Sequence, residues 1–274
     1  MASVNTNVGA LVALQNLNTT NRQLEITQNR INTGLKVSSA RDNGGAFAIA
    51  QQLRGEVGAY NAVKDSLSRV QSAVDVASAA GTAISDLLIE LKEKALAASD
   101  SSLDATSRTA LNEDFAALRD QIATVVSNAT FNGVNLINNS TATIKALANT
   151  TGSSTIDVQD ENLSLAGTIV TIAATEAINT VTKAAAALTK ITASITNVGA
   201  SLARLGSKSK ALEIQSTFVV KLQDATTAGI GNLVDADLAK ESANLQALQV
   251  KQQLGVQALS IANSAPSIVL GFFR

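Results

Sequence analysis

The feature that most constrains the fold is a pair of apolar series, each repeating every seven residues, in the first half of the chain. One series consists of Leu53, Tyr60, Leu67, Val74, Gly81, Leu88 and Ala95, and the other of Val63, Val70, Ala77, Ile84, Leu91 and Ala98. An a/d seam of about six heptads predicts a long helix wound on a partner helix. Such a helix over 46–98 would be about 80 Å long. We interpret its apolar residues as packing residues and not as a cofactor site.

The second half repeats this pattern. One series is Val181, Leu188, Ile195 and Leu202, and the other is Ala184, Ile191, Val198, Leu205, Leu212 and Val219. A sustained period of about 3.5 residues indicates helices wound on one another, here over 176–226. A shorter helix is expected over 104–129, with a seam formed by Leu111, Phe115, Leu118, Ile122, Val125 and Ala129. The chain is therefore predicted to be mostly α, with long coiled-coil helices from both halves.

The segment between these helical blocks has a different composition. The stretch "FNGVNLIN" at 131–138 contains an Asn-Gly turn signal, and the residues after it are rich in Ser, Thr and Asn. β-Branched residues alternate near 155–159. We therefore expect turns and short β-hairpins over 131–175, at the tip of a helical hairpin.

The two ends of the chain each predict a helix with two apolar faces. Leu17, Leu24 and Ile31 are spaced by seven, with Leu14 beside them, whereas Val8, Val12 and Ile26 fall on another side. After a predicted break at 227–231, one face carries Leu238, Leu245, Leu248 and Leu259, and the opposite face carries Val250, Leu254 and Ile261. Two opposed stripes indicate packing partners on both sides. We hypothesise that both ends are poorly ordered in the monomer and fold on assembly.

Composition excludes several function classes. The chain has no Cys, His or Trp, which rules out zinc sites built on Cys or His, cysteine nucleophiles and schemes with a histidine base. The net charge of −1, without a Lys/Arg block, argues against nucleic-acid binding. No window is expected to approach the roughly 18–20 apolar residues of a membrane span. We therefore predict no catalytic residue, no metal, no cofactor and no membrane insertion.

Three stretches of the sequence resemble the motifs of a known protein family. "NTNVGALVALQNL" with "RINTGLKVSSARDNGGAFAIA", the mid-chain "FNG" at 131–133, and "QALSIANSAPSIVLGFFR" resemble the N-terminal, central and C-terminal motifs of bacterial flagellins. The motifs occur in the family's order and are separated by heptad helices. The resemblance covers all but about 139–175, and the short variable region is most similar to the compact alphaproteobacterial type.

The resemblance implies a layout of two nested antiparallel pairings. Residues 1–45 would form an N-terminal inner-tube helix and spoke, 46–230 a rod-like outer domain, and 231–274 a C-terminal inner-tube helix pairing with 1–34. The implied inner-tube contacts are Leu14, Leu17, Leu24, Ile31, Leu245, Leu248, Leu254, Leu259, Ile261, Val269, Leu270, Phe272 and Phe273. The implied spoke residues are Gly34, Arg41, Asp42, Gly44 and Gly45, where glycines permit tight backbone approaches and Arg41 and Asp42 would form inter-subunit ion pairs.

The resemblance also changes the expected location. The N-terminus lacks the basic region, apolar core and cleavage site of a secretory signal, which on residues alone indicates the cytosol. Flagellins, however, are exported unfolded through the flagellar channel and assemble outside the cell. The implied partners are other flagellin copies, the filament cap, the hook-junction protein, an export chaperone and the export apparatus.

Two other readings remain open. A hook–filament junction protein resembles flagellin at both ends, but it usually carries a larger middle region. A non-flagellar signalling coiled coil would show the same heptads, together with a membrane span or a sensor module.

A departure from the family bears on Toll-like receptor 5. Within "LLIELKEKALAAS" at 87–99, this chain has Glu90 where receptor-activating flagellins have an Arg, and Lys94 where they have a Leu. Asp114 stands where an acidic residue is expected. A reversed charge and an inserted ammonium should each weaken binding, so we predict weak or absent activation.

Overall fold

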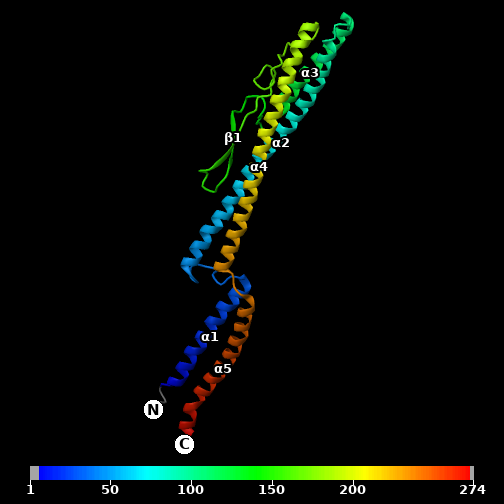
Figure 1. Ribbon diagram of the computed structural model, residues 1–274. Coiled ribbons are helices and arrows are strands. Elements are labelled where there is room, and N and C mark those ends of the chain that lie inside the picture. The colour runs from blue at the N-terminus through cyan, green and yellow to red at the C-terminus, as the bar shows by residue number, and fades with distance from the viewer. Residues whose placement is uncertain (1–5, 272–274) are drawn as a thin grey trace. The chain divides into compact units, whose positions relative to one another are not determined.

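The computed structural model describes residues 6–271, with side chains up to Ser264. Within this range the chain is mostly helical, with one two-stranded sheet (Figure 1). The elements are α1 (Val8–Thr33), α2 (Gly44–Ala98), α3 (Ala105–Asn128), β1 (Thr143–Leu147), β2 (Thr155–Gln159), α4 (Val181–Val234) and α5 (Leu238–Gly271). They form two compact units: a terminal unit, residues 6–57 with 224–271, and a middle unit, residues 58–223.

The heptad seam on α2 is the buried side of that helix in the middle unit. The predicted seam positions from Val63 to Ala98 are all buried, and Leu67, Ile84, Leu88 and Leu91 expose 1% or less of their surface. On α4 the second predicted series is equally buried, with Ala184, Ile191 and Val198 fully inaccessible. The predicted coiled-coil seam is therefore confirmed, except that in the first series of α4 Val181 is exposed and Leu188, Ile195 and Leu202 are only partly buried.

A glycine in the seam marks a close approach of α2 and α4. A Cβ added at Gly81 would lie 2.8 Å from Cδ2 of Leu202, which is a seam residue of α4. Polar contacts fix the antiparallel register, since Gln71 Nε2 donates to Ser209 Oγ (2.7 Å) and Gln223 Nε2 donates to Asn61 Oδ1 (2.9 Å).

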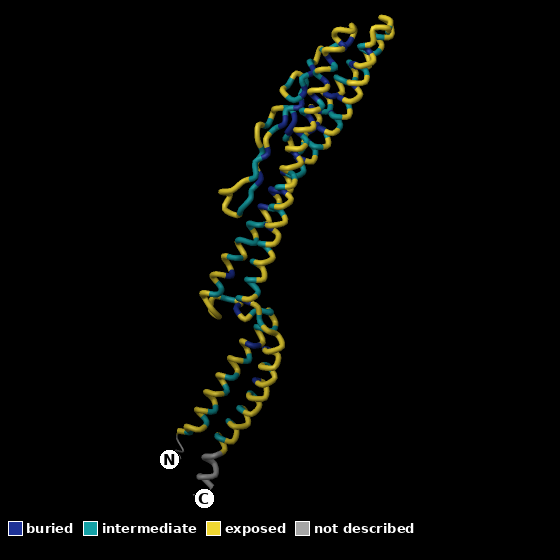
Figure 2. Tube along the Cα trace, viewed as in Figure 1, coloured by how far each residue is buried: buried dark blue, intermediate teal, exposed yellow. Residues whose placement is uncertain are grey.

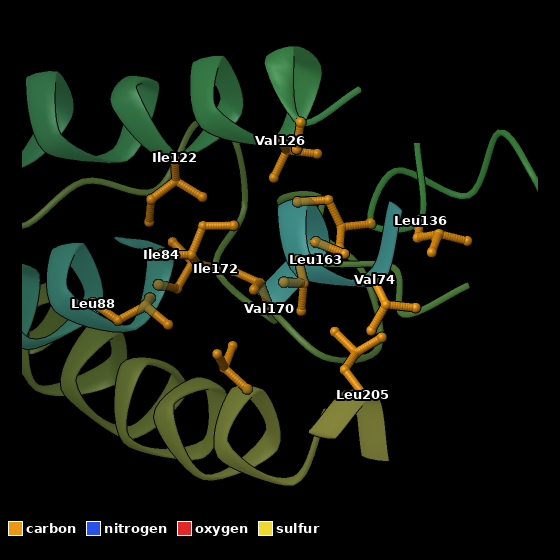
Figure 3. Close-up of a cluster of buried hydrophobic side chains, with 14 of the residues drawn as sticks. Val74, Ile84, Leu88, Ile122, Val126, Leu136, Leu163, Val170, Ile172 and Leu205 are labelled. Carbon is orange, nitrogen blue, oxygen red and sulfur yellow. The ribbon is translucent and has the colours of Figure 1, made fainter. Parts of the chain in front are cut away.

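Helix α3 runs back along α2 and completes the core. The Arg108 guanidinium donates to the carbonyl of Ala98 (2.9 Å), and Lys94 pairs with Asp114, so the two helices are antiparallel. Figure 3 shows the resulting core, in which side chains from three helices and the segment before α4 converge. The labelled residues are Val74, Ile84, Leu88, Ile122, Val126, Leu136, Leu163, Val170, Ile172 and Leu205.

The segment between α3 and α4 contains the predicted Asn-Gly turn and one hairpin. Asn132 (φ 49°) and Gly133 (φ 78°) both have positive φ, and Phe131 and Val134 exchange backbone hydrogen bonds of 2.8 and 2.9 Å. This is the geometry that an Asn-Gly turn favours. β1 and β2 pair antiparallel, with Ile144 opposite Val158. The predicted turn and hairpin are confirmed.

The predicted place of this hairpin was wrong. We expected it at the tip of a helical hairpin, but Leu147 N–H donates to Ser66 Oγ (3.1 Å) and Gln215 Nε2 donates to Ala148 O (2.7 Å). The hairpin therefore lies along α2 and α4, away from the α2–α3 connection. The reason is that α3 folds back on α2 and carries the chain away from that tip before the hairpin begins.

The predicted limits of α4 also need correction. The helix begins at Val181, not 176, because Thr180 caps it: its Oγ1 accepts from Lys183 N (3.3 Å). It continues without the break predicted at 227–231 and ends at Val234. A helical glycine costs about 0.5–1 kcal/mol, which is outweighed here by burial of Val234 against Val37 and Ala50.

The expectation that no segment would be apolar enough for a membrane span needs correction for α2. It contains an 18-residue window with a mean hydropathy of 1.3 and no more than two charged residues, which passes a membrane-span test by length and composition alone. However, 39% of that window is buried inside the protein. A core helix produces the same signal because its packing face is apolar.

Candidate functional site

Helices α1 and α5 pair in the terminal unit through part of the predicted apolar set. Leu248 exposes 8% of its surface, and the other paired residues are partly buried: Leu17, Leu24, Ile31, Leu245 and Leu259. A Cβ added at Gly255 would lie 3.2 Å from Cδ1 of Leu17, so the helices approach closely there.

Polar contacts at one end and midway along the pair set its antiparallel register. Asn7 Nδ2 donates to Ala262 O (2.6 Å), and Gln252 Nε2 donates to Asn21 Oδ1 (2.8 Å). The Asn7 side chain also caps α1 by accepting from Ala10 N (3.0 Å). The two helices therefore have one defined alignment along their described lengths.

Large apolar side chains of both helices stay exposed within the described chain. Figure 2 shows α1 and α5 coloured mostly as exposed along their described lengths. Leu254 exposes 58% and Ile261 71% of their surfaces, and Leu14 exposes 43%. The other exposed apolar residues of α1 and α5 are Val8, Leu11, Val12, Ile26, Leu238, Val250 and Val256. Both helices carry apolar residues on two sides, as their sequence patterns predict, but Leu14 and Leu238, which were expected on the pairing faces, are exposed by 43% and 49%. The patterns missed Leu11, which lies between the two faces of α1, and Val256, which lies about 20° around α5 from Leu245 and is nevertheless exposed.

Four predicted contact residues fall where the structure gives no description. Phe272 and Phe273 lie outside the described residues, and Val269 and Leu270 are described only as backbone within α5. Their role in contacts between copies stays a prediction.

A partly buried ion pair that the sequence analysis missed lies in the α1–α5 interface. Arg30 Nη1 is 3.0 Å from Glu241 Oε1, and the Glu241 side chain is 11% exposed. Glu241 Oε2 is buried and has no hydrogen-bond partner in the described chain. Glu241 stands in the first turn of α5, where the helix dipole favours a carboxylate, and that position is the only signal the sequence offers.

The segment between α1 and α2, which the family layout assigns to the spoke, is pinned to the chain between α4 and α5. Gly34 ends α1 in the left-handed region (φ 71°), and its carbonyl accepts from Ala236 N (2.8 Å). Lys36 N donates to Val234 O (2.7 Å), and Lys36 Nζ donates to Asn232 O (2.9 Å). The two connections of the terminal unit therefore run side by side and are held mostly by backbone hydrogen bonds.

Asp42 organises the rest of that segment. Its Oδ2 accepts from the backbone N–H and the hydroxyl of both Ser38 and Ser39, at 2.9–3.1 Å. These hydrogen bonds, led by the Ser38 hydroxyl, lower the pKa of the Asp42 carboxyl below its ordinary value of 3.8. The Asp42 carboxylate is thus used within its own chain, and the predicted inter-subunit pairing of Arg41 and Asp42 stays a prediction.

Gly44 and Gly45 do not have the role within the chain that the sequence analysis gave them. Both lie in the first turn of α2 without a positive φ, and no atom lies within 4 Å of a Cβ built on Gly44. The start of α2 is set instead by Asn43, whose Oδ1 accepts from Ala46 N (3.0 Å). The sequence analysis missed this cap, although Asn is a preferred residue there.

The three residues of the predicted receptor-recognition region, the departures Glu90 and Lys94 and the matching Asp114, lie in the middle unit. Lys94 Nζ on α2 is 2.6 Å from Asp114 Oδ2 on α3, so the structure joins two of them in an ion pair. Glu90 is exposed on α2. The Lys94 ammonium is therefore held by an acidic group of its own chain.

Comparison with known proteins identifies what these helices are similar to. Residues 4–142 match the bacterial flagellin N-terminal helical region, and residues 188–273 match the bacterial flagellin C-terminal helical region. The chain is 53% identical to Flagellin FljM of Caulobacter vibrioides, over 99% of this chain and 98% of that protein. It is 37% identical to a flagellin of Brucella melitensis over the full length of both.

Solved structures share the fold at low sequence identity. A flagellin from Bacillus cereus superposes with a TM-score of 0.51 at 18% identity, over 56% of this chain and 88% of that one. A putative flagellar hook-associated protein from Vibrio parahaemolyticus superposes with a TM-score of 0.59 at 14% identity, over 71% of this chain and all of that one.

Proposed function

The chain belongs to the bacterial flagellin family, and from that premise we propose that the exposed apolar faces of α1 and α5 join its copies in the filament. The family is structural, so the chain is a subunit of the flagellar filament that serves motility, and not an enzyme. What the proposal adds is which surfaces make the polymer. It assigns the inner-tube contacts to the terminal unit.

The observation that carries this proposal is the pair of opposed faces on each terminal helix. One face is used in the α1–α5 pairing, whereas Val8, Leu254 and Ile261 expose 65%, 58% and 71% of their surfaces. Removing apolar surface from water contributes about 25 cal/mol of stabilising free energy per Å² buried. Covering these faces therefore favours association. A face that meets a different face on the next copy, without closing a ring, extends into a filament.

The proposed layout follows the family. Residues 1–45 and 231–274 form the inner tube and spoke, and 46–230 form the outer domain. The pinned connections at 34–37 and 234–236 support a spoke with a defined path, because their backbone hydrogen bonds hold it to the end of α4. Arg41, which is exposed, is the residue there best placed to meet another copy.

We further propose that the chain leaves the cell unfolded through the flagellar channel, since the family forms an extracellular filament. The absence of Cys from the sequence supports this route, because no disulfide can block threading. The expected partners on this route are an export chaperone, the export apparatus, the hook-junction protein and the filament cap.

The junction-protein alternative has less support. The hook-associated neighbour shares only the fold at 14% identity, whereas flagellins match over 99% of the chain at more than half identity. A signalling coiled coil would not explain a match to both terminal regions of the flagellin family.

Seeded assembly of a Leu254→Glu variant tests the proposal. Monomer is mixed with short filament fragments, pelleted, and imaged by negative-stain electron microscopy. Leu254 is exposed in the monomer, so the variant should fold, but assembly would bury an unpaired carboxylate at a cost of several kcal/mol. We expect the polymerised fraction to fall at least about tenfold.

The matched control is Gln253→Glu, which adds the same charge at the neighbouring exposed position, about 100° around the helix. It should polymerise nearly as well as the parent chain. Equal polymerisation of Leu254→Glu and Gln253→Glu would show that this face of α5 is not a contact between copies.

A further inference from the structure

The one proline of the chain lies inside a helix. Pro266 belongs to α5, which continues past it to Gly271. In an α-helix the N–H of each residue donates to the carbonyl four residues earlier, and proline has no N–H. The carbonyl of Ala262 therefore lacks the donor that residue 266 would normally supply. It needs another donor, either water or another part of the protein.

The side chain of Asn7 supplies this donor from the start of α1. Asn7 Nδ2 donates to Ala262 O at 2.6 Å, across 255 positions of sequence. The same side chain caps α1, because its Oδ1 accepts from Ala10 N (3.0 Å). The two contacts together fix the orientation of the amide, since turning it over would place oxygen against oxygen. Asn7 thus serves both helices, as a cap for α1 and as a donor for α5.

Small residues allow the two helices to approach closely at this contact. A Cβ added at Gly9 would lie 4.0 Å from Cβ of Ala262, which is van der Waals contact. The large side chains beside them, Val8 and Ile261, are mostly exposed. Apolar burial therefore contributes little to holding the helices together here, and the hydrogen bond from Asn7 is a specific contact at this end.

This end of the pair is also far from the connections that pin the two helices. At the other end, Ala236 N donates to Gly34 O (2.8 Å). Helix α1 spans 26 residues, so at 1.5 Å per residue it begins about 39 Å from that hydrogen bond. Chain ends are poorly ordered unless a contact holds them. The start of α1 therefore depends on contacts made at its own end.

We propose that Asn7 and Pro266 form a clasp that closes the α1–α5 pair at this end. Pro266 leaves the Ala262 carbonyl without its helical donor, and Asn7 provides the replacement. Because a partly buried carbonyl without a partner is costly, α5 favours the arrangement in which α1 lies against it. The inference rests on the filament function proposed above. In that function Asn7 is a positioning residue, which holds the start of α1 and the last turns of α5 together for assembly.

Two engineered cysteine pairs measure closure of the clasp, because the parent chain contains no Cys. Gly9→Cys with Ala262→Cys reports on the clasped end, where the Cβ atoms would be 4.0 Å apart. Leu17→Cys with Gly255→Cys is the matched control farther along the pair, with the Cβ atoms 3.8 Å apart. Both separations suit a disulfide. Oxidation rates of dilute monomer are read on non-reducing gels, and the ratio of the two rates cancels changes in the pairing as a whole.

Asn7→Asp removes the donor but keeps the cap. Aspartate caps a helix as well as asparagine does, whereas its carboxylate cannot donate to a carbonyl. We expect this change to lower the ratio of the clasp rate to the control rate at least about fivefold. Seeded elongation of the variant without cysteines should slow by a similar factor. An unchanged ratio would overturn the clasp.

Pro266→Ala tests whether the proline is part of the clasp. Alanine restores the N–H for the Ala262 carbonyl, so the amide of Asn7 should matter less. In that background Asn7→Asp should lower the ratio by no more than about twofold. An equal loss in both backgrounds would overturn the clasp while leaving the filament function intact. A parent chain that forms no filaments on seeds would contradict the filament function itself.

Discussion

At the scale of single residues, close approach and hydrogen bonding decide which positions matter. Gly81 stands in the α2 seam because Leu202 of α4 occupies the space where a side chain would go. Asp42 orders the segment before α2 by accepting four hydrogen bonds from two serines. Neither role is evident from the residue type alone.

Replacing Gly81 should destabilise the middle unit. In Gly81→Val the new Cβ would lie 2.8 Å from Cδ2 of Leu202, so the seam must shift. Overpacking of this kind costs about 1–3 kcal/mol. The control is Gly199→Val on α4, where no atom lies within 4 Å of an added Cβ. Urea unfolding followed by circular dichroism should show a lower midpoint for Gly81→Val only, and equal midpoints would contradict the close packing.

Asp42 should make the order of its segment depend on pH. Hydrogen bonds from Ser38 and Ser39 lower the pKa of the folded carboxyl below 3.8. The stabilisation is therefore present above the unfolded value and is lost as the pH falls through the lower, folded one. The amide NMR signals of Ser38 and Ser39 should shift in that acidic range, and Asp42→Asn should abolish the shift. Signals that titrate equally in both proteins would refute it.

At the scale of elements, each long helix is explained by what its faces meet. In the middle unit the buried sides of α2, α3 and α4 enclose one core, to which the segment 129–180 contributes Leu163, Val170 and Ile172. In the terminal unit α1 and α5 bury one face each and leave apolar residues exposed on the other. The α1–α5 pair is therefore the element pair with most to gain from further contacts.

The terminal helices should become protected when copies assemble. In the monomer, limited proteolysis is expected to cut within 1–40 and 236–274 while leaving most of the middle unit intact, since α1 and α5 bury little surface by themselves. In filaments the same sites should be at least about tenfold slower to cut. Fragments identified by mass spectrometry give the cleavage sites. Resistant termini in a verified monomer would contradict folding on assembly.

At the scale of the whole molecule, the chain acts by presenting surfaces to copies of itself. The exposed faces of the terminal helices are apolar and uncovered among the described residues, as a filament subunit requires. The same middle unit would also meet a host receptor as a free subunit. The surface predicted to face the receptor carries the Lys94–Asp114 ion pair and the exposed carboxylate of Glu90.

We expect purified monomer to activate Toll-like receptor 5 weakly or not at all. Contact with Lys94 would require its ammonium to leave Asp114 and lose water, and Glu90 would repel a partner suited to an arginine. The double variant Glu90→Arg with Lys94→Leu should raise the response at least about tenfold in a reporter-cell assay. A strong response to the parent chain would refute this prediction.

The sequence alone predicted the buried helix faces better than it predicted individual polar contacts. The heptad series predicted the helices, the buried residues of α2 and the two-faced ends, because an apolar period reports directly which side of a helix is buried. It did not predict the Arg30–Glu241 pair or the four hydrogen bonds to Asp42. The Arg30–Glu241 pair depends on where distant parts of the chain meet, and the hydrogen bonds to Asp42 depend on the local backbone path of residues 38–42. An apolar period records neither.

The sequence by itself thus determined the element types, the packing faces and the family. Only the tertiary structure decided where the hairpin lies, that α4 continues through Gly229 and Gly231, and which predicted contact residues pair α1 with α5 and which stay exposed. The physical reason is the same in each case. Local propensities differ by about 1 kcal/mol or less, whereas burial against a distant segment is worth more, so the distant partner decides the outcome.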